Sequence, residues 1–150
     1  MGKFAVSLTG GDAARGKDIF FSHTASQCVR CHKAEGVGGI AGPDLSDVAK
    51  RHPEKTRAYL LESLVLPNAQ IAKGYASVTL TLADGRTLAG VIEDETKTAV
   101  TLKLPDGKTA TVPVDDIDKR TVPTSPMPSV EKVLTHREMR DLIEYLSSLK

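Results

Sequence analysis

The sequence predicts an α+β fold, in which a mainly helical part is interrupted by an inserted four-stranded antiparallel β-meander. Apolar residues recur with helical spacing up to residue 70 and again near the C-terminus, whereas between these regions they alternate with polar residues. Two Asp-Gly pairs, which favour tight hairpin turns, interrupt the alternating region. The expected organisation is a single domain over 1–150, with a helical core at 11–70 and 121–150 and the meander at 71–120.

Three helices are predicted in the first half of the chain. The first covers 12–22, and Asp12 is suited to be its N-cap because a short acidic side chain can accept the unpaired backbone N–H groups of the first turn. A short helix at 44–51 and a longer one at 54–66 follow. Pro67 ends the longer helix, since the residue before a proline is disfavoured in helical conformation.

The meander is predicted from four runs of alternating apolar and polar residues. These runs cover residues 75–82, 86–92, 98–104 and 108–114. Asp84-Gly85 separates the first two runs and Asp106-Gly107 separates the last two, which is the strongest short-range signal for a hairpin. Pro113 indicates that the last strand lies at an edge of the sheet or is ending, because proline cannot donate a ladder hydrogen bond.

The C-terminal region consists of a proline-rich loop at 121–130 and a final helix that reaches about residue 148. Thr135 and Glu138 have the spacing of a capping box, which predicts where this helix begins. Met139 falls on its apolar face together with several leucines, so we expect Met139 to pack in the core.

The pentapeptide Cys28-Val29-Arg30-Cys31-His32 contains the only two cysteines of the chain. Two cysteines separated by two residues and followed at once by a histidine have the spacing of c-type haem attachment. Thiols one helical turn apart can each add to a haem vinyl group, and the adjacent histidine can then ligate the iron. The motif therefore predicts one haem c, bound covalently through Cys28 and Cys31, with His32 as an axial ligand.

Three other readings of the cysteine pair are weaker. A thioredoxin-like redox pair needs a βαβ context, which the neighbouring sequence lacks. A zinc site needs two further ligands at finger-like spacing, and no second such pair is present in the sequence. A disulfide across two residues would close a very small loop, so its entropic contribution to stability would be small.

A glycine-rich loop at 36–43 follows the motif. It has no Gly-Lys-Ser/Thr ending, which excludes a phosphate-binding loop of the Walker type. We expect its glycines to let the backbone approach a flat cofactor closely.

Met127 is the favoured second axial ligand. It lies between two prolines in a polar loop, where no helical or strand stripe accounts for an apolar side chain. The alternative is that Met127 only covers the core from the loop. Among the other candidates, His23 lies close before the motif, His52 resembles a solvated helix end that could touch a haem propionate, and His136 lies in the first turn of the last helix.

These residues resemble a class I c-type cytochrome. Gly16 and Phe20 in the first helix, and Tyr145 in the last, are similar to the contact between the terminal helices of that fold. The resemblance implies helices arranged around a haem, with the meander as an insertion, and it matches Met127 to the family's methionine-bearing loop.

The segment Gly42-Pro43-Asp44-Leu45 is similar to another loop of the same family. In that loop the proline carbonyl accepts a hydrogen bond from the second ring nitrogen of the ligand histidine. Carried over to this chain, the resemblance implies that Pro43 fixes the tautomer of His32 and raises its basicity.

A narrower resemblance covers about 12–149. It is to a haem-binding cytochrome family of Planctomycetes and Verrucomicrobia, often the C-terminal domain of large exported proteins that can carry a propeller-type dehydrogenase-like domain. The segments that carry this resemblance are Gln27–His32, Tyr59–Ser63, Pro67–Ala69, Gly74-Tyr75, Asp84–Gly90 and Met127-Pro128. The meander is the departure from an ordinary small cytochrome. Without residues 71–120, the number of residues between His32 and Met127 would be ordinary for such a cytochrome.

The expected function is one-electron transfer, with iron held by His32 and Met127 and with no enzymatic activity of the chain alone. The rival reading is a haem sensor or a peroxidase-like protein whose distal site is open or displaceable, with His52 as the one histidine that could serve there. The ferric spin state separates the two readings, because iron with two strong protein ligands is low-spin.

Location and partners follow from the chemistry and the charge. Haem c is normally attached outside the cytoplasm, so a periplasmic or otherwise exported protein is expected, although the first six residues are too short for a signal peptide. We therefore expect a processed protein or an excised domain, monomeric in isolation.

With 20 basic and 19 acidic residues the net charge is +1, which favours neither nucleic acid nor a membrane surface. No stretch reaches the roughly 18 apolar residues of a transmembrane helix. A net charge of +1 gives little electrostatic steering toward a freely diffusing partner. We therefore expect a redox partner protein that is tethered to this chain, such as a fused dehydrogenase-like domain.

Overall fold

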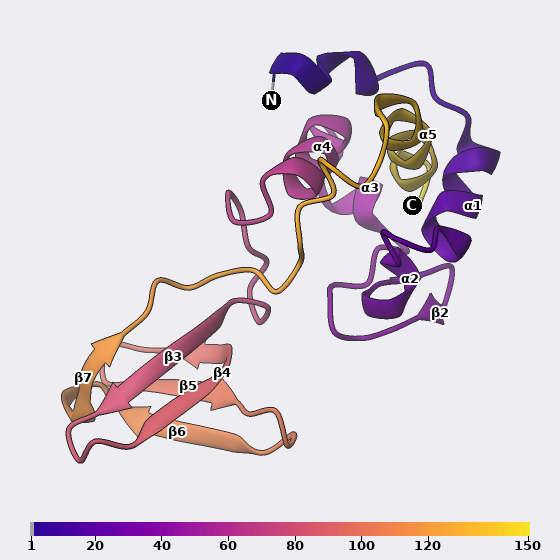
Figure 1. Ribbon diagram of the computed structural model, residues 1–150. Coiled ribbons are helices and arrows are strands. Elements are labelled where there is room, and N and C mark those ends of the chain that lie inside the picture. Colours follow the sequence, from indigo (N-terminus) through magenta and orange to yellow (C-terminus); the bar gives the residue numbers. More distant parts are fainter. Residues whose placement is uncertain (1) are drawn as a thin grey trace. The chain divides into compact units, whose positions relative to one another are not determined.

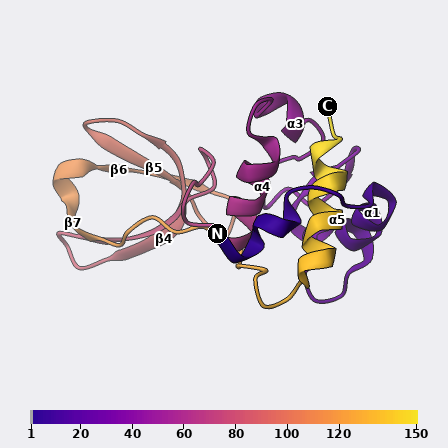
Figure 2. The ribbon, with the colours of Figure 1, turned by 90° about the horizontal axis from the view of Figure 1, so that it is seen from above.

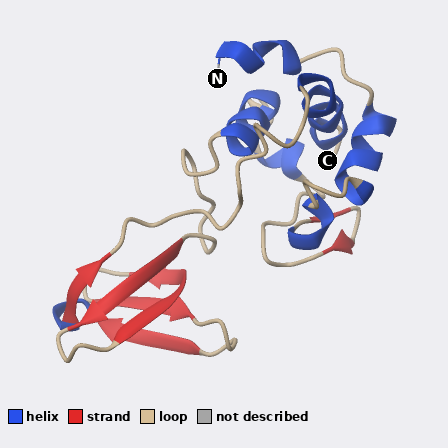
Figure 3. Cartoon of the chain, viewed as in Figure 1, coloured by secondary structure: helices blue, strands red, loops and turns tan. Residues whose placement is uncertain are grey.

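The computed structural model describes residues 2–150 and divides into two compact units (Figure 1). The helical unit runs to Ala69 and resumes from Met127 to Lys150, and the sheet unit is Gln70–Pro126. Each unit has its own hydrophobic core. The helices and the larger sheet thus separate along the chain as the change of periodicity predicts (Figure 3).

The helical unit contains one 3₁₀ helix, five α-helices and a two-stranded hairpin in the described residues. In chain order they are η1 (Gly2–Ser7), α1 (Ala13–Ser22), α2 (Cys28–Cys31), β1 (Lys33–Ala34), β2 (Val37–Gly38), α3 (Val48–Arg51), α4 (Thr56–Val65) and α5 (His136–Ser147). The sequence indicates α1, α4 and α5 well, whereas η1 and the hairpin are too short to show a period.

The predicted caps are confirmed at both ends of the helical unit. The Asp12 carboxylate accepts the backbone N–H groups of Ala14 and Arg15, which opens α1. Thr135 and Glu138 form the reciprocal capping box of α5. These contacts satisfy backbone donors that have no partner inside their helices.

The terminal helices α1 and α5 pack directly against each other (Figure 2). A Cβ atom on Gly16 would lie 1.9 Å from the Asp141 carbonyl oxygen and 2.7 Å from the Tyr145 Cβ, so glycine is required for this close approach. The Phe20 ring lies with its centroid 6.0 Å from that of Tyr145. The predicted contact between the terminal helices is therefore confirmed.

The sheet unit is a five-stranded antiparallel sheet rather than the predicted four-stranded meander. Its elements are β3 (Ser77–Leu82), β4 (Thr87–Glu95), β5 (Ala99–Lys103), β6 (Thr109–Pro113), the 3₁₀ helix η2 (Val114–Asp116) and β7 (Ile117–Arg120). The spatial order is β6-β5-β4-β3-β7. The first four strands form the meander, and β6, which ends at Pro113, lies at one edge as expected. The sequence missed β7 because its four residues contain a single apolar side chain, so they show no alternation.

The two hairpin turns form where the Asp-Gly pairs predict them. Gly85 and Gly107 have φ angles of +87° and +83°, which side chains with a Cβ rarely adopt. The sheet unit also extends beyond the predicted end at residue 120, because Thr121 donates a backbone hydrogen bond to Thr79 and Thr124 pairs with Ser77.

Separate cores lead to a prediction about the sheet unit. Replacing Gln70–Pro126 by a flexible Gly/Ser linker of about 10 residues should leave the helical unit folded, because the buried side chains of the helical core all lie outside the replaced segment. Far-ultraviolet circular dichroism should show the helical signal retained with one cooperative thermal transition. A shortened chain that is unfolded would show instead that the helical core depends on the sheet.

Candidate functional site

The two cysteine thiols and the following histidine are presented by the single-turn helix α2. Gln27 precedes α2 with a positive φ of 46°, and His32 follows it in extended conformation, its N–H donating to the Cys28 carbonyl at 2.9 Å. Cys28 is half-buried and Cys31 is exposed, and both thiols are free. The structure therefore contains no disulfide at this motif.

The Cys28 thiol donates a weak hydrogen bond to Ser26, with 3.6 Å between sulfur and oxygen. Burial raises its pKa above the ordinary thiol value, so it is a protonated thiol at neutral pH. Within residues 2–150 no group of three or more His, Cys, Asp or Glu side chains is placed to bind a metal.

The His32 ring is oriented by Pro43, eleven residues further along the chain. Nδ1 of His32 lies 2.8 Å from the Pro43 carbonyl oxygen. Because a carbonyl only accepts, Nδ1 carries the proton and Nε2 carries the lone pair. This is the hydrogen bond that the family resemblance implies for these two residues.

The protonation of His32 suits a metal ligand. Burial lowers its pKa below the ordinary histidine value, although the hydrogen bond to Pro43 opposes this. The ring is therefore neutral at physiological pH. In the described part of the chain, the structure shows no hydrogen bond to Nε2, the atom that a metal would use.

The glycine-rich loop packs on the motif itself. A Cβ on Gly42 would lie 2.5 Å from Cε1 of the His32 ring, and one on Gly39 would lie 2.0 Å from the Arg30 carbonyl oxygen. Gly39 and Gly42 also donate backbone hydrogen bonds to Val29 and Cys31, at 2.9 and 2.8 Å. The sequence predicts a close approach to a flat cofactor, and the structure shows a second reason for these glycines: they let the loop close over α2 and His32.

Met127 is half-buried and packs against the core of the helical unit, as Cys28 and Val29 also do. The cysteine motif and residues 127–130, called the methionine loop below, therefore contact the same hydrophobic core. Met139, by contrast, is completely buried within that core, as its position on the apolar face of α5 predicts.

The three other histidines are engaged elsewhere. His23 accepts the Ser26 N–H on Nδ1, and its Nε2 lies 3.7 Å from the Glu138 carboxylate. The His136 ring meets the Phe4 ring edge to face, with centroids 4.9 Å apart. His52 lies at a helix end as expected, since it is the C-cap of α3, but it is half-buried and its ring stacks on that of Tyr59 with centroids 3.7 Å apart.

A polar contact next to the motif was not anticipated. The Glu35 carboxylate, in the β1–β2 turn, accepts the Tyr145 hydroxyl at 3.0 Å and lies 2.6 Å from Lys17 Nζ. Lys17 and then Tyr145 lower the pKa of Glu35, whereas burial and the nearby carboxylate raise that of Tyr145. The contact ties the turn that follows His32 to both terminal helices. Its members are too far apart in sequence for spacing to reveal it.

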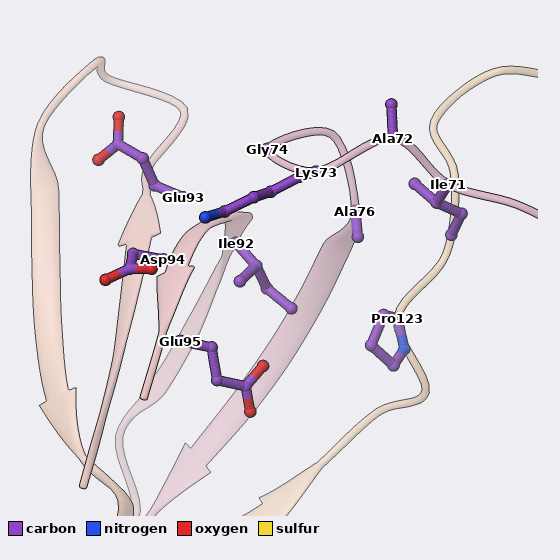
Figure 4. A pocket seen from close by; sticks show the side chains of 10 residues that line it. All are labelled: Ile71, Ala72, Lys73, Gly74, Ala76, Ile92, Glu93, Asp94, Glu95 and Pro123. Atoms are coloured by element: carbon purple, nitrogen blue, oxygen red, sulfur yellow. The ribbon is translucent and has the colours of Figure 1, made fainter. Parts of the chain in front are cut away.

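The sheet unit contains a cavity of about 260 Å³ (Figure 4). Its apolar wall includes Ile71, Ile92 and Pro123, and Lys73 and an acidic run at 93–95 also line it. The cavity has no thiol, imidazole or thioether in its lining, so it offers none of the ligands that the sequence predicts for the site.

Comparison with known proteins gives one family match. Residues 13–82 match the family model of cytochrome c. No curated protein matches the chain. Among solved structures, the chain is similar to a 1.55 Å crystal structure of the pleiotropic translational regulator Hfq, with 26% identity over 44% of this chain and 97% of that one. The TM-score of 0.29 is too low to indicate a shared fold.

The family match includes α1, the cysteine motif, His32 and Pro43, whereas Met127 and α5 lie outside it. Cytochrome c domains bind haem c covalently, transfer electrons and are generally extracytoplasmic. No helix within residues 2–150 combines the length and the apolar character that crossing a membrane requires. The resemblance to the narrower planctomycete and verrucomicrobial family stays a prediction. The match supports a c-type cytochrome over the segment that carries the CxxCH motif.

Proposed function

We propose that this chain is a monohaem electron carrier with one histidine and one methionine as axial ligands. The observation that carries the proposal is the arrangement of α2, where two free thiols lie one turn apart. The following His32 ring is kept neutral by burial and is oriented by Pro43. When bound, haem c supplies a reversible one-electron Fe(III)/Fe(II) couple. One motif with two cysteines accommodates one such group.

The residues of the chain would have distinct roles in this proposal. Cys28 and Cys31 would hold the porphyrin through thioether bonds, and His32 would offer Nε2 as the proximal ligand. Pro43 orients that ring and keeps the lone pair on Nε2. Met127 would offer its thioether from the proline-rich loop, and a His/Met pair raises the reduction potential relative to two histidines.

Filling both axial positions with side chains of the protein disfavours substrate chemistry. This is why we propose a carrier rather than an enzyme, and it separates the carrier from the rival sensor or peroxidase-like protein. His52, the one histidine considered for a distal role, is stacked on Tyr59, which supports the carrier.

The ferric absorption spectrum tests the proposal. We expect a low-spin spectrum with the weak far-red charge-transfer band of thioether ligation, and a one-electron Nernst curve in a redox titration. A high-spin ferric spectrum would favour the open-site rival.

The partner belongs to the same proposal. A redox protein or a fused dehydrogenase-like domain as electron donor is supported by the resemblance and by a net charge of +1. The salt dependence of electron exchange with candidate proteins distinguishes a tethered partner from a freely diffusing one, since only the latter depends on steering.

A further inference from the structure

The loop that carries Met127 meets the C-terminal end of α4. Val130 donates its backbone N–H to the Leu64 carbonyl at 3.0 Å, and the Ser129 hydroxyl donates to the Val65 carbonyl at 2.8 Å. Leu64 and Val65 are the last two residues of α4, and the last carbonyls of a helix have no partner within it. The methionine loop therefore supplies donors that the end of α4 needs.

The two donors lie close to Met127 in the chain, so their hydrogen bonds to α4 restrict the position of Met127. Pro126 and Pro128 flank the methionine and have no backbone N–H, so neither can donate a main-chain hydrogen bond. Ser129 is two residues beyond Met127, and Val130 is almost fully buried in the helical core. The bond from Ser129 is thus a side-chain anchor close to the proposed ligand.

We infer that Ser129 is a positioning residue for Met127, which fixes the methionine loop on the end of α4 and thereby keeps the thioether in place. The inference rests on the proposed function, in which Met127 binds iron. Without the hydroxyl, the Val65 carbonyl loses its donor in a setting where Val65 itself is buried. If the loop detaches from α4 more often, the sixth coordination position of the iron is open for a larger fraction of the time. The apparent affinity of an external ligand then rises in proportion to that fraction.

The test is imidazole binding to the ferric holoprotein, followed by loss of the far-red thioether band. Ser129→Ala should tighten apparent imidazole binding about fivefold, equivalent to about 1 kcal/mol for the lost hydrogen bond to Val65. The Ser129 hydroxyl also accepts the Glu131 N–H at 3.3 Å, and the substitution removes this longer contact as well. Ser129→Thr keeps the hydroxyl and should stay within about twofold of the parent. Ser148→Ala is the matched control, because Ser148 donates to the Tyr145 carbonyl at the end of α5, at 2.6 Å.

The two variants separate positioning from a general loss of stability. Both remove one hydroxyl from a helix-end carbonyl, although the Tyr145 carbonyl keeps the Ser148 N–H as a second donor at 3.0 Å. The melting temperature should therefore fall in both variants, less so for Ser148→Ala, whereas only Ser129→Ala should change imidazole affinity. Equal imidazole affinities in Ser129→Ala and Ser148→Ala would overturn the positioning role while leaving Met127 as a ligand. A parent protein without the far-red band would overturn the ligation itself, and the positioning role with it.

Discussion

Haem should stay with the polypeptide when the denatured protein is extracted with acidic acetone. The mass of the extracted protein should exceed the mass of the bare chain by one haem. The reason is the motif on α2, whose two thiols lie one helical turn apart and are not joined to each other. Each thiol can add its S–H bond across one vinyl C=C bond, so that a C–S bond forms and the hydrogen goes to the other carbon. No oxidant is needed for this addition, and the product resists acid.

Cysteine variants make the expectation quantitative. Cys28→Ser and Cys31→Ser should each retain haem through the one remaining thioether, whereas the double variant should release all of its colour into the extract. The extracted fraction is measured from the absorbance of the two phases. A parent protein that loses all its haem on extraction would contradict covalent attachment.

Local signals predicted most of the helical and strand boundaries. The Asp12 cap, the Thr135–Glu138 capping box and the glycines of the two hairpin turns each act over a few residues, so the sequence shows them directly. The motif itself is equally local, since the spacing of its thiols and of His32 already specifies the chemistry.

Contacts between distant parts of the chain account for what the sequence missed. Strand β7 exists because β3 offers it an unpaired edge, not because its residues 117–120 alternate. The bond from Tyr145 to Glu35 joins residues from opposite ends of the chain. The hydrogen bond from Ser129 to Val65 likewise joins residues that are 64 positions apart in sequence, so it becomes visible only when the end of α4 and the methionine loop are considered together.

The glycine-rich loop shows how one residue pattern can have more than one cause. The sequence establishes that residues 36–43 allow a close approach, but not what approaches. In the structure the neighbours are the His32 ring and the carbonyl groups of the motif. Gly42 therefore helps to place the His32 ring, because any larger side chain there would collide with the ring that Pro43 holds.

Met127→Ala should abolish the far-red band of the ferric protein and open the iron to cyanide or imidazole. The substitution removes the thioether, while Pro43 still orients His32 and both thioether bonds to the cysteines remain possible. The measurement is the ferric spectrum before and after addition of imidazole. Stability should fall by less than for a core residue, since the Met127 side chain is only half-buried.

Met139→Ala is the matched control, because it deletes the same side chain from the core of α5. Met139 is completely buried, so its truncation should destabilise the protein by about 2–5 kcal/mol through lost packing and the cavity left behind. The far-red band should nevertheless remain in the folded protein. If instead Met139→Ala removed the band and Met127→Ala kept it, the axial ligand would be the methionine of the helix and not that of the loop. The pair of variants therefore assigns the ligand by spectrum and the core residue by stability, two readouts that do not depend on each other.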